Sequence, residues 1–142
     1  MSFDLERFVD AQDGSYEGAL RELRAGRKRS HWMWFVFPQL AGLGRSEMAH
    51  RYGIASLDEA RAYLAHPVLG QRLLECVTAV LAAHAASAES MLGSTDAMKL
   101  RSSMTLFQRA APAERSFGAV LERFYGGVAD EATDTLLRGR GR

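Results

Sequence analysis

Residues 30–39, which read Ser-His-Trp-Met-Trp-Phe-Val-Phe-Pro-Gln, constrain the fold of this chain more than any other stretch. They contain both tryptophans of the sequence, and no side chain between His31 and Pro38 is charged. An aromatic side chain buries about 150–250 Å² on folding. We therefore predict that this segment lies at the centre of the fold.

The conformation of this segment is less clearly encoded than its burial. Ser30 can cap a short helix that runs to Phe37 and ends before Pro38, because proline disfavours a helical conformation in the residue before it. A buried strand would suit aromatic and β-branched residues equally well, and so short a run has no decisive periodicity. We predict a helix because little else in the chain resembles a strand partner, and a lone strand would leave backbone groups unpaired.

Helix start and stop signals recur along the rest of the chain. The start signals are Ser46, the capping-box spacing Ser56-Leu57-Asp58-Glu59, Thr95 or Asp96, Pro112 and Asp130. His66-Pro67 is expected to begin the longest helix, and glycines such as Gly53 and Gly93 are placed to end helices.

These signals predict an all-α fold. We expect residues 1–137 to form a compact single domain of about nine or ten mostly short helices, packed irregularly and orthogonally rather than as a regular bundle. Residues 138–142 form an Arg/Gly tail that we expect to be frayed.

The composition indicates the setting of the protein and excludes some partners. The 142 residues are 47% hydrophobic and 25% charged, as in an ordinary soluble domain. Eighteen basic and seventeen acidic side chains give a net charge of +1, which argues against bulk attraction to nucleic acid or to a membrane. A single cysteine, an N-terminus unlike a signal peptide and the lack of a bilayer-length apolar run predict a cytoplasmic protein.

A second segment, the twelve residues that start at Asp96, brings polar side chains next to apolar ones. On a helix, Asp96, Lys99 and Ser103 share one polar stripe, while Ser102 and Thr105 lie on another flank. Hydroxyl groups beside a lysine near a helix N-terminus can hold a phosphate or a carboxylate. A solvated face, with the hydroxyls bonded to the preceding turn, explains the same spacing.

We hypothesise a small-molecule site between these two segments, since such sites combine an apolar lining with a few polar groups. The expected ligand is a small anion or a nucleotide-like metabolite. The candidate ligand-binding residues are His31, Trp32, Trp34, Gln39, His66, Arg72, Asp96, Lys99, Ser102, Ser103 and Thr105.

No catalytic residue can be assigned, so the sequence leaves open whether the protein is an enzyme. We expect no cofactor. We also expect no metal site, because the four histidines form no ligand pattern and one cysteine cannot build a zinc cluster.

Two other functions fit the same sequence. An aromatic patch that reached the surface would make the protein an interaction module without catalytic activity, although no protein partner is indicated. The basic cluster at residues 24–29 could bind nucleic acid, but a few bases in a nearly neutral domain are usually solvated.

Several motifs resemble those of the bacterial family catalogued as domain of unknown function 1810. The most specific are His31-Trp32-Met33-Trp34-Phe35, Phe37-Pro38-Gln39, Gly42-Leu43-Gly44, His66-Pro67 and Ser102-Ser103-Met104-Thr105-Leu106-Phe107. The resemblance runs from about Asp4 to Leu137 and implies a small all-α protein with no established reaction, substrate or ligand. Some members are labelled calpastatin-like, which implies an extended protease inhibitor, whereas this chain is apolar and rich in helix signals.

Overall fold

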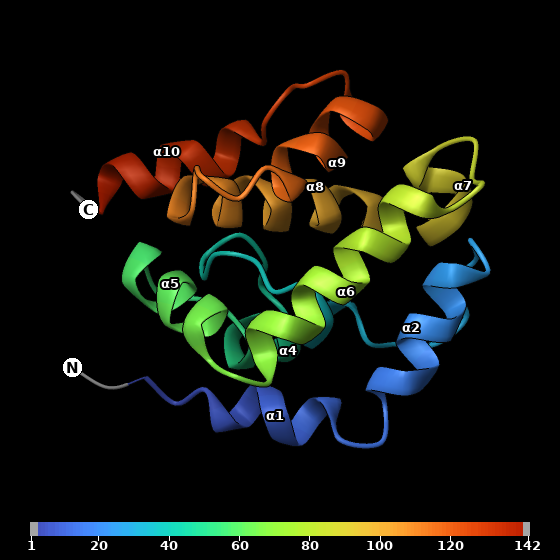
Figure 1. The fold of residues 1–142 in the computed structure, drawn as a ribbon. Coiled ribbons are helices and arrows are strands. Elements are labelled where there is room, and N and C mark those ends of the chain that lie inside the picture. The colour runs from blue at the N-terminus through green and yellow to red at the C-terminus, as the bar shows by residue number, and fades with distance from the viewer. Residues whose placement is uncertain (1–2, 141–142) are drawn as a thin grey trace.

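Helix α8 (Ser94–Ala110) is the longest helix of the described chain and runs through the middle of the molecule (Figure 1). The structure, a computed structural model, describes residues 3–140. Residues 102–107 are all buried, so this part of α8 is enclosed on every side rather than along a single stripe. It packs against α5 (Leu57–Ala65), α7 (Ala88–Leu92), α9 (Ser116–Tyr125) and α10 (Glu131–Gly139).

The remaining helices complete a fold that is all-helical over residues 3–140, with ten helices and no strand beyond one isolated bridge. They are α1 (Glu6–Gln12), α2 (Tyr16–Arg24), α3 (Met33–Val36), α4 (Glu47–Arg51) and α6 (Leu69–Ala82). In Figure 1, α6 crosses the molecule diagonally, with α1 and α2 on one side and α8 to α10 on the other. The prediction of an irregular all-α fold is confirmed. None of the described helices combines the length and apolarity needed to cross a membrane.

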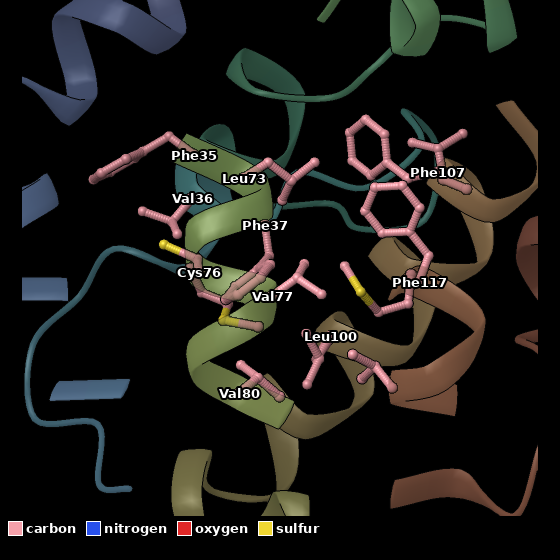
Figure 2. Packing of buried hydrophobic residues seen from close by; sticks show 14 of the residues in the cluster. Phe35, Val36, Phe37, Leu73, Cys76, Val77, Val80, Leu100, Phe107 and Phe117 are labelled. Atoms are coloured by element: carbon pink, nitrogen blue, oxygen red, sulfur yellow. The ribbon is translucent and has the colours of Figure 1, made fainter. Parts of the chain in front are cut away.

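The aromatic segment lies in the core, as predicted. Phe35, Val36 and Phe37 belong to one hydrophobic cluster with side chains of α6, α8 and α9, part of which Figure 2 shows. A second row of rings extends this packing, because Tyr63 contacts both Phe8 and Phe107 at centroid distances of 5.1 and 5.5 Å. These ring contacts join α1, α5 and α8 around one hydrophobic cluster.

The predicted helix from Ser30 to Phe37 is wrong at both ends. Only Met33–Val36 is helical, and the residue before it, Trp32, makes no capping bond through its side chain. Beyond Phe37 the chain pairs with a distant segment: the Ala41 N–H donates to the Ile54 carbonyl (2.8 Å), and the Ile54 N–H donates to the Gln39 carbonyl (2.9 Å). Leu40, directly after the aromatic segment, and Ile54 thus form one isolated parallel bridge and no strand.

Three of the predicted helix caps are present. The side chains of Ser46, Ser56 and Asp130 each accept a hydrogen bond of 3.0–3.2 Å from the backbone N–H three residues ahead, at the starts of α4, α5 and α10. The capping box of α5 differs in detail, because Glu59 accepts from the Ala55 N–H (2.7 Å) rather than from that of Ser56.

Other predicted boundaries need correction. Helix α8, with 17 residues, is longer than the 14-residue α6 that follows His66-Pro67. Thr95 and Asp96 lie inside α8, which begins directly after Gly93, so neither caps it. Helix α9 begins at Ser116, after the turn that contains Pro112.

The predicted tail is ordered over the residues that the structure describes. Helix α10 continues to Gly139, and the Arg140 guanidinium donates to the carbonyls of Ala41 (2.6 Å) and Ala55 (3.2 Å). The prediction of a frayed tail is therefore wrong for residues 138–140, because a tertiary contact holds the end of the helix. Residues 141–142 lie outside the described residues.

The closest approach of two helices generates a stability prediction. Gly70, near the start of α6, faces the last turn of α5, and a Cβ added there would lie 2.0 Å from the Leu64 carbonyl oxygen. Because this oxygen belongs to the backbone, Gly70→Ala should destabilise the protein by about 3 kcal/mol in urea unfolding. The control is Gly18→Ala in α2, where the nearest atom is an Arg21 nitrogen at 3.7 Å. It should stabilise by about 0.5–1 kcal/mol, and equal effects of the two changes would contradict the packing.

Candidate functional site

A charged triad joins the start of α8 to the chain just before the aromatic segment. Asp96, in the first turn of α8, pairs with Lys28 (Nζ to Oδ2, 2.9 Å) and with Lys99 (Nζ to Oδ1, 3.5 Å). The side chains of Lys28, Asp96 and Lys99 are 9%, 18% and 22% exposed. Two ammonium groups share one carboxylate, so the triad carries a formal charge of +1 in a largely buried position.

Each lysine of the triad also lies over one tryptophan ring. The Lys28 Nζ is 5.2 Å from the ring centre of Trp32, and the Lys99 Nζ is 4.4 Å from that of Trp34. Trp32 is buried, and its Nε1–H donates to Glu22 (2.9 Å), so this ring belongs to the core. Trp34 is only partly buried and adjoins the site.

A groove of about 260 Å³ opens beside Lys99, and we call it the Lys99 groove. Its walls come from residues 39–44, from the first half of α8 and from the start of α10. The lining includes Gln39, Leu43, Met98, Lys99, Ser102 and Asp130. Behind Lys99, toward Trp34 and Tyr52, a separate space of only about 10 Å³ has room for about one water molecule. The room between the two segments therefore lies mainly on the outer side of Lys99.

Gln39 separates the groove from the small space behind it, since it lines both. Its Oε1 atom is buried and has no hydrogen-bond partner among the described residues. An unpaired buried polar atom costs about 1–3 kcal/mol. Gln39 therefore places a polar side chain with an unpaired oxygen at the boundary of the groove.

The α8 hydroxyl groups that the sequence analysis selected are mostly used within the fold. Ser102 lines the groove, but its hydroxyl donates to the Met98 carbonyl (3.2 Å) of the preceding turn. Thr105 donates to the Arg101 carbonyl and accepts from the Asp130 N–H, both at 2.8 Å. Ser103 is fully buried away from the groove. The hydroxyls of Ser102 and Thr105 thus bond to the preceding turn of α8, which is the alternative that the sequence left open.

Three further candidate residues lie neither in the Lys99 groove nor in the triad and have other environments. His31 is exposed. The Nδ1 of His66 accepts from the backbone N–H groups of Val68 and Leu69 (3.1 and 3.3 Å) and so supports the start of α6. Arg72 donates to Gln12 Oε1 (3.2 Å) and lies over the ring of Tyr16, where it joins α6 to α1 and α2. The structure therefore brings together Trp34, Gln39, Asp96, Lys99 and Ser102 only.

Sequence reasoning missed Lys28 and understood Asp130 only as a helix cap. Lys28 was counted with the basic cluster at residues 24–29, but its side chain is buried against Asp96 and its backbone N–H donates to the Met91 carbonyl (2.8 Å). The exposed part of the cluster therefore consists of Arg24, Arg27 and Arg29, without the charge of Lys28. No local sequence signal marks Lys28, because its partners lie in α7 and α8.

Glu22 of α2 holds the loop that carries Lys28. Its carboxylate accepts bonds from the N–H groups of Arg29 (2.8 Å) and Ser30 (3.0 Å), from the Ser30 hydroxyl (2.6 Å) and from Trp32. Burial alone would raise the pKa of Glu22, but these hydrogen bonds outweigh it and lower the pKa to about 2. Ser30 thus serves this loop rather than capping a helix.

Thiol chemistry and metal binding depend on the environment of Cys76 and on the placement of the possible metal ligands. Cys76 is buried on α6, and burial raises the pKa of its thiol to about 12, which keeps it protonated and unreactive. Within residues 3–140, no three side chains of the histidine, cysteine, aspartate and glutamate types are grouped so that they could hold a metal ion.

The fold defines a small all-helical protein with a groove beside Lys99 as its candidate site. A family model described as "Protein of unknown function (DUF1810)" matches residues 2–137, and the chain belongs to this family. The chain is also similar to the conserved hypothetical protein Rv1873 from Mycobacterium tuberculosis, whose crystal structure is at 1.38 Å. That match has 56% identity and a TM-score of 0.94, and covers 96% of this chain and 97% of the other. No curated protein matches the chain.

The lowered pKa of Glu22 predicts a pH-dependent stability. The stabilisation is fully present above the ordinary pKa of 4.5 and is lost as the pH falls from about 4.5 to about 2. Glu22→Gln should therefore be less stable than the wild type at neutral pH, and this difference should shrink across that interval. Urea unfolding of both proteins at several pH values tests this, and a difference that does not change with pH would contradict it.

Two neighbouring hydroxyls of α8 should respond in opposite ways to removal. Ser103 Oγ is buried with no hydrogen-bond partner among the described residues, so Ser103→Ala should raise the free energy of unfolding by about 1 kcal/mol. Thr105→Val removes two hydrogen bonds and leaves the Asp130 N–H unpaired, so it should lower that free energy by about 1–2 kcal/mol. Urea unfolding measures both, and a loss of stability in Ser103→Ala would show that its hydroxyl has a partner.

Proposed function

We propose that the protein binds a small molecule through an anionic group in the Lys99 groove. The observation that carries this proposal is the excess positive charge of the Lys28–Asp96–Lys99 triad. Lys28 is the closer partner of Asp96 and is the more buried lysine, so Lys99 is the less compensated charge and is the one that faces the groove. A largely buried charge without a full counter-charge is unfavourable, and a bound anion would offset that cost.

The rest of the groove supports a small organic ligand. Leu43 and Met98 are apolar, and Gln39 supplies an amide. An apolar lining with a few polar groups is typical of small-molecule sites. Met98 is 71% exposed, so its side chain is free to cover a bound molecule.

The size of the groove favours a metabolite smaller than a nucleotide. Its volume of about 260 Å³ lies below the range of sites for drug-sized ligands, about 300–1,000 Å³. A nucleotide would have to extend into the neighbouring open hollow at the start of α10, which Glu131 lines. The carboxylate of Glu131 would repel further phosphate groups there.

The two other functions have less support. The interaction hypothesis required aromatic side chains at the surface, but the large apolar side chains that are exposed within residues 3–140 are Val68, Met98 and Val128, none of them aromatic. The nucleic-acid hypothesis relies on the basic cluster at residues 24–29, of which Lys28 is buried against Asp96 and only Arg24, Arg27 and Arg29 are exposed.

Titration by NMR with propionate, butyrate and inorganic phosphate at constant ionic strength tests this function. We expect at least one of these anions to shift the indole N–H signal of Trp34 and the backbone amides of residues 39–44. The indole of Trp32, held in the core by Glu22, serves as an internal reference and should not move. If no anion shifts the Trp34 and groove signals, the proposal is wrong.

Two variants with the same charge change assign the binding to Lys99. Lys99→Gln should weaken binding of the anion at least about tenfold, because a charged hydrogen bond contributes about 1.5–3 kcal/mol. Arg27→Gln removes the same charge from an exposed position outside the groove and should bind like the wild type. Equal weakening in both variants would indicate nonspecific attraction instead of a site.

A further inference from the structure

The proposed function leaves one charged residue of the Lys99 groove without a role in recognition, namely Asp130. Asp130 caps α10: its Oδ2 atom accepts hydrogen bonds from the N–H (3.0 Å) and the hydroxyl (2.6 Å) of Thr133. Within the described part of the chain, Asp130 forms no salt bridge with a basic side chain. The cap therefore uses one carboxylate oxygen, and the carboxylate keeps its negative charge in the groove.

Asp130 is held in place relative to Lys99 by contacts between two helices. Its backbone N–H donates to the Thr105 hydroxyl of α8 (2.8 Å). One turn further along α10, Asp134 forms a two-pronged ion pair with Arg109 of α8, with both distances 2.9 Å. Since α8 also carries Lys99, packed helices rather than a free loop set the separation of the two charges.

The groove is therefore lined by charges of both signs, with Lys99 on α8 and Asp130 at the start of α10. The triad contributes a formal +1 through Lys99, and Asp130 contributes −1, so together they are neutral. A molecule with only a negative charge would be attracted by Lys99 but repelled by Asp130. A molecule that is negative at one end and positive at the other would be attracted at both ends.

We propose that the ligand is dipolar, a small amino acid or a related molecule that carries both a carboxylate and an ammonium group. The carboxylate pairs with Lys99, and the ammonium pairs with the carboxylate of Asp130. The carbon chain between them lies against Leu43 and Met98, the apolar side chains of the same groove. This inference rests on the proposed function, because it requires the anionic group to bind at Lys99.

Pairs of probes that differ only in the amino group test the inference. Alanine and β-alanine are compared with propionate, γ-aminobutyrate with butyrate, and ε-aminocaproate with caproate, each titrated by NMR into the full-length protein. We expect at least one amino acid to bind about tenfold or more tightly than its matching carboxylate, as a charged hydrogen bond would produce. The chain length that gives this preference would report the spacing of the two charges.

Asp130→Asn removes the charge and preserves the helix start, because asparagine is as good an N-cap as aspartate. In this variant the amino acid should bind about as tightly as its matching carboxylate, and the binding of the carboxylate should not weaken. Lys99→Gln should weaken both members of each pair. Asp130→Ser, which also retains an N-cap residue, is the second variant if Asp130→Asn is unstable in urea unfolding.

The outcomes separate this inference from the proposed function. If carboxylates bind and Lys99→Gln abolishes that binding, but no amino acid is preferred, the dipolar ligand is wrong and the anion site stands. A preference that persists in Asp130→Asn also overturns the assignment of the ammonium group. If only inorganic phosphate binds, the dipolar ligand is wrong and the anion site stands. If amino acids, carboxylates and inorganic phosphate all fail to bind, both proposals fail.

Discussion

The burial of the aromatic segment is the constraint on which the rest of this structure depends. Once Trp32, Phe35 and Phe37 enter the core, every polar group attached to that segment needs a partner at the core boundary. The Trp32 indole finds Glu22, and Lys28 just before the segment finds Asp96 on α8. The charged triad is thus a direct consequence of core packing, and the groove lies where that packing ends.

A second regularity explains how so many short helices can satisfy their backbone groups without a sheet. Arginine side chains reach across the fold and donate to backbone carbonyls in loops and at helix ends. Arg7 donates to the carbonyls of Arg51 and Gly53, both at 2.8 Å, and Arg123 donates to that of Ala83 at 2.5 Å. Because buried carbonyls without partners are costly, these long side chains replace the hydrogen bonds that longer helices or strands would make. Arg140 does the same for the segment next to the groove.

The walls of the Lys99 groove are held in place by different kinds of contact. Lys99 and Asp130 belong to helices that are tied together by Thr105 and by the Arg109–Asp134 pair. The opposite wall, residues 39–44, is irregular chain held through the bridge to Ile54 and the contact with Arg140. Charges that packed helices hold in place, beside the apolar Leu43 of this wall, suit the recognition of a small polar molecule, in keeping with the binding role that we propose.

The sequence by itself determined those features that depend on residues a few positions apart. It specified the helical class, the caps at Ser46, Ser56 and Asp130, and the burial of the aromatic segment, because caps and apolar patterns act locally. The family resemblance, confirmed over residues 2–137, agreed with that fold but named no site.

Only the tertiary structure decided which polar residues meet. It separated His31, His66 and Arg72 from Lys99, and it joined Lys28 to Asp96 from a distant part of the chain. Periodicity places a side chain on one face of its own helix but does not specify which other helix packs there. A charge buried at such a contact acquires its partner, and hence its function, only when the apolar faces have been brought together.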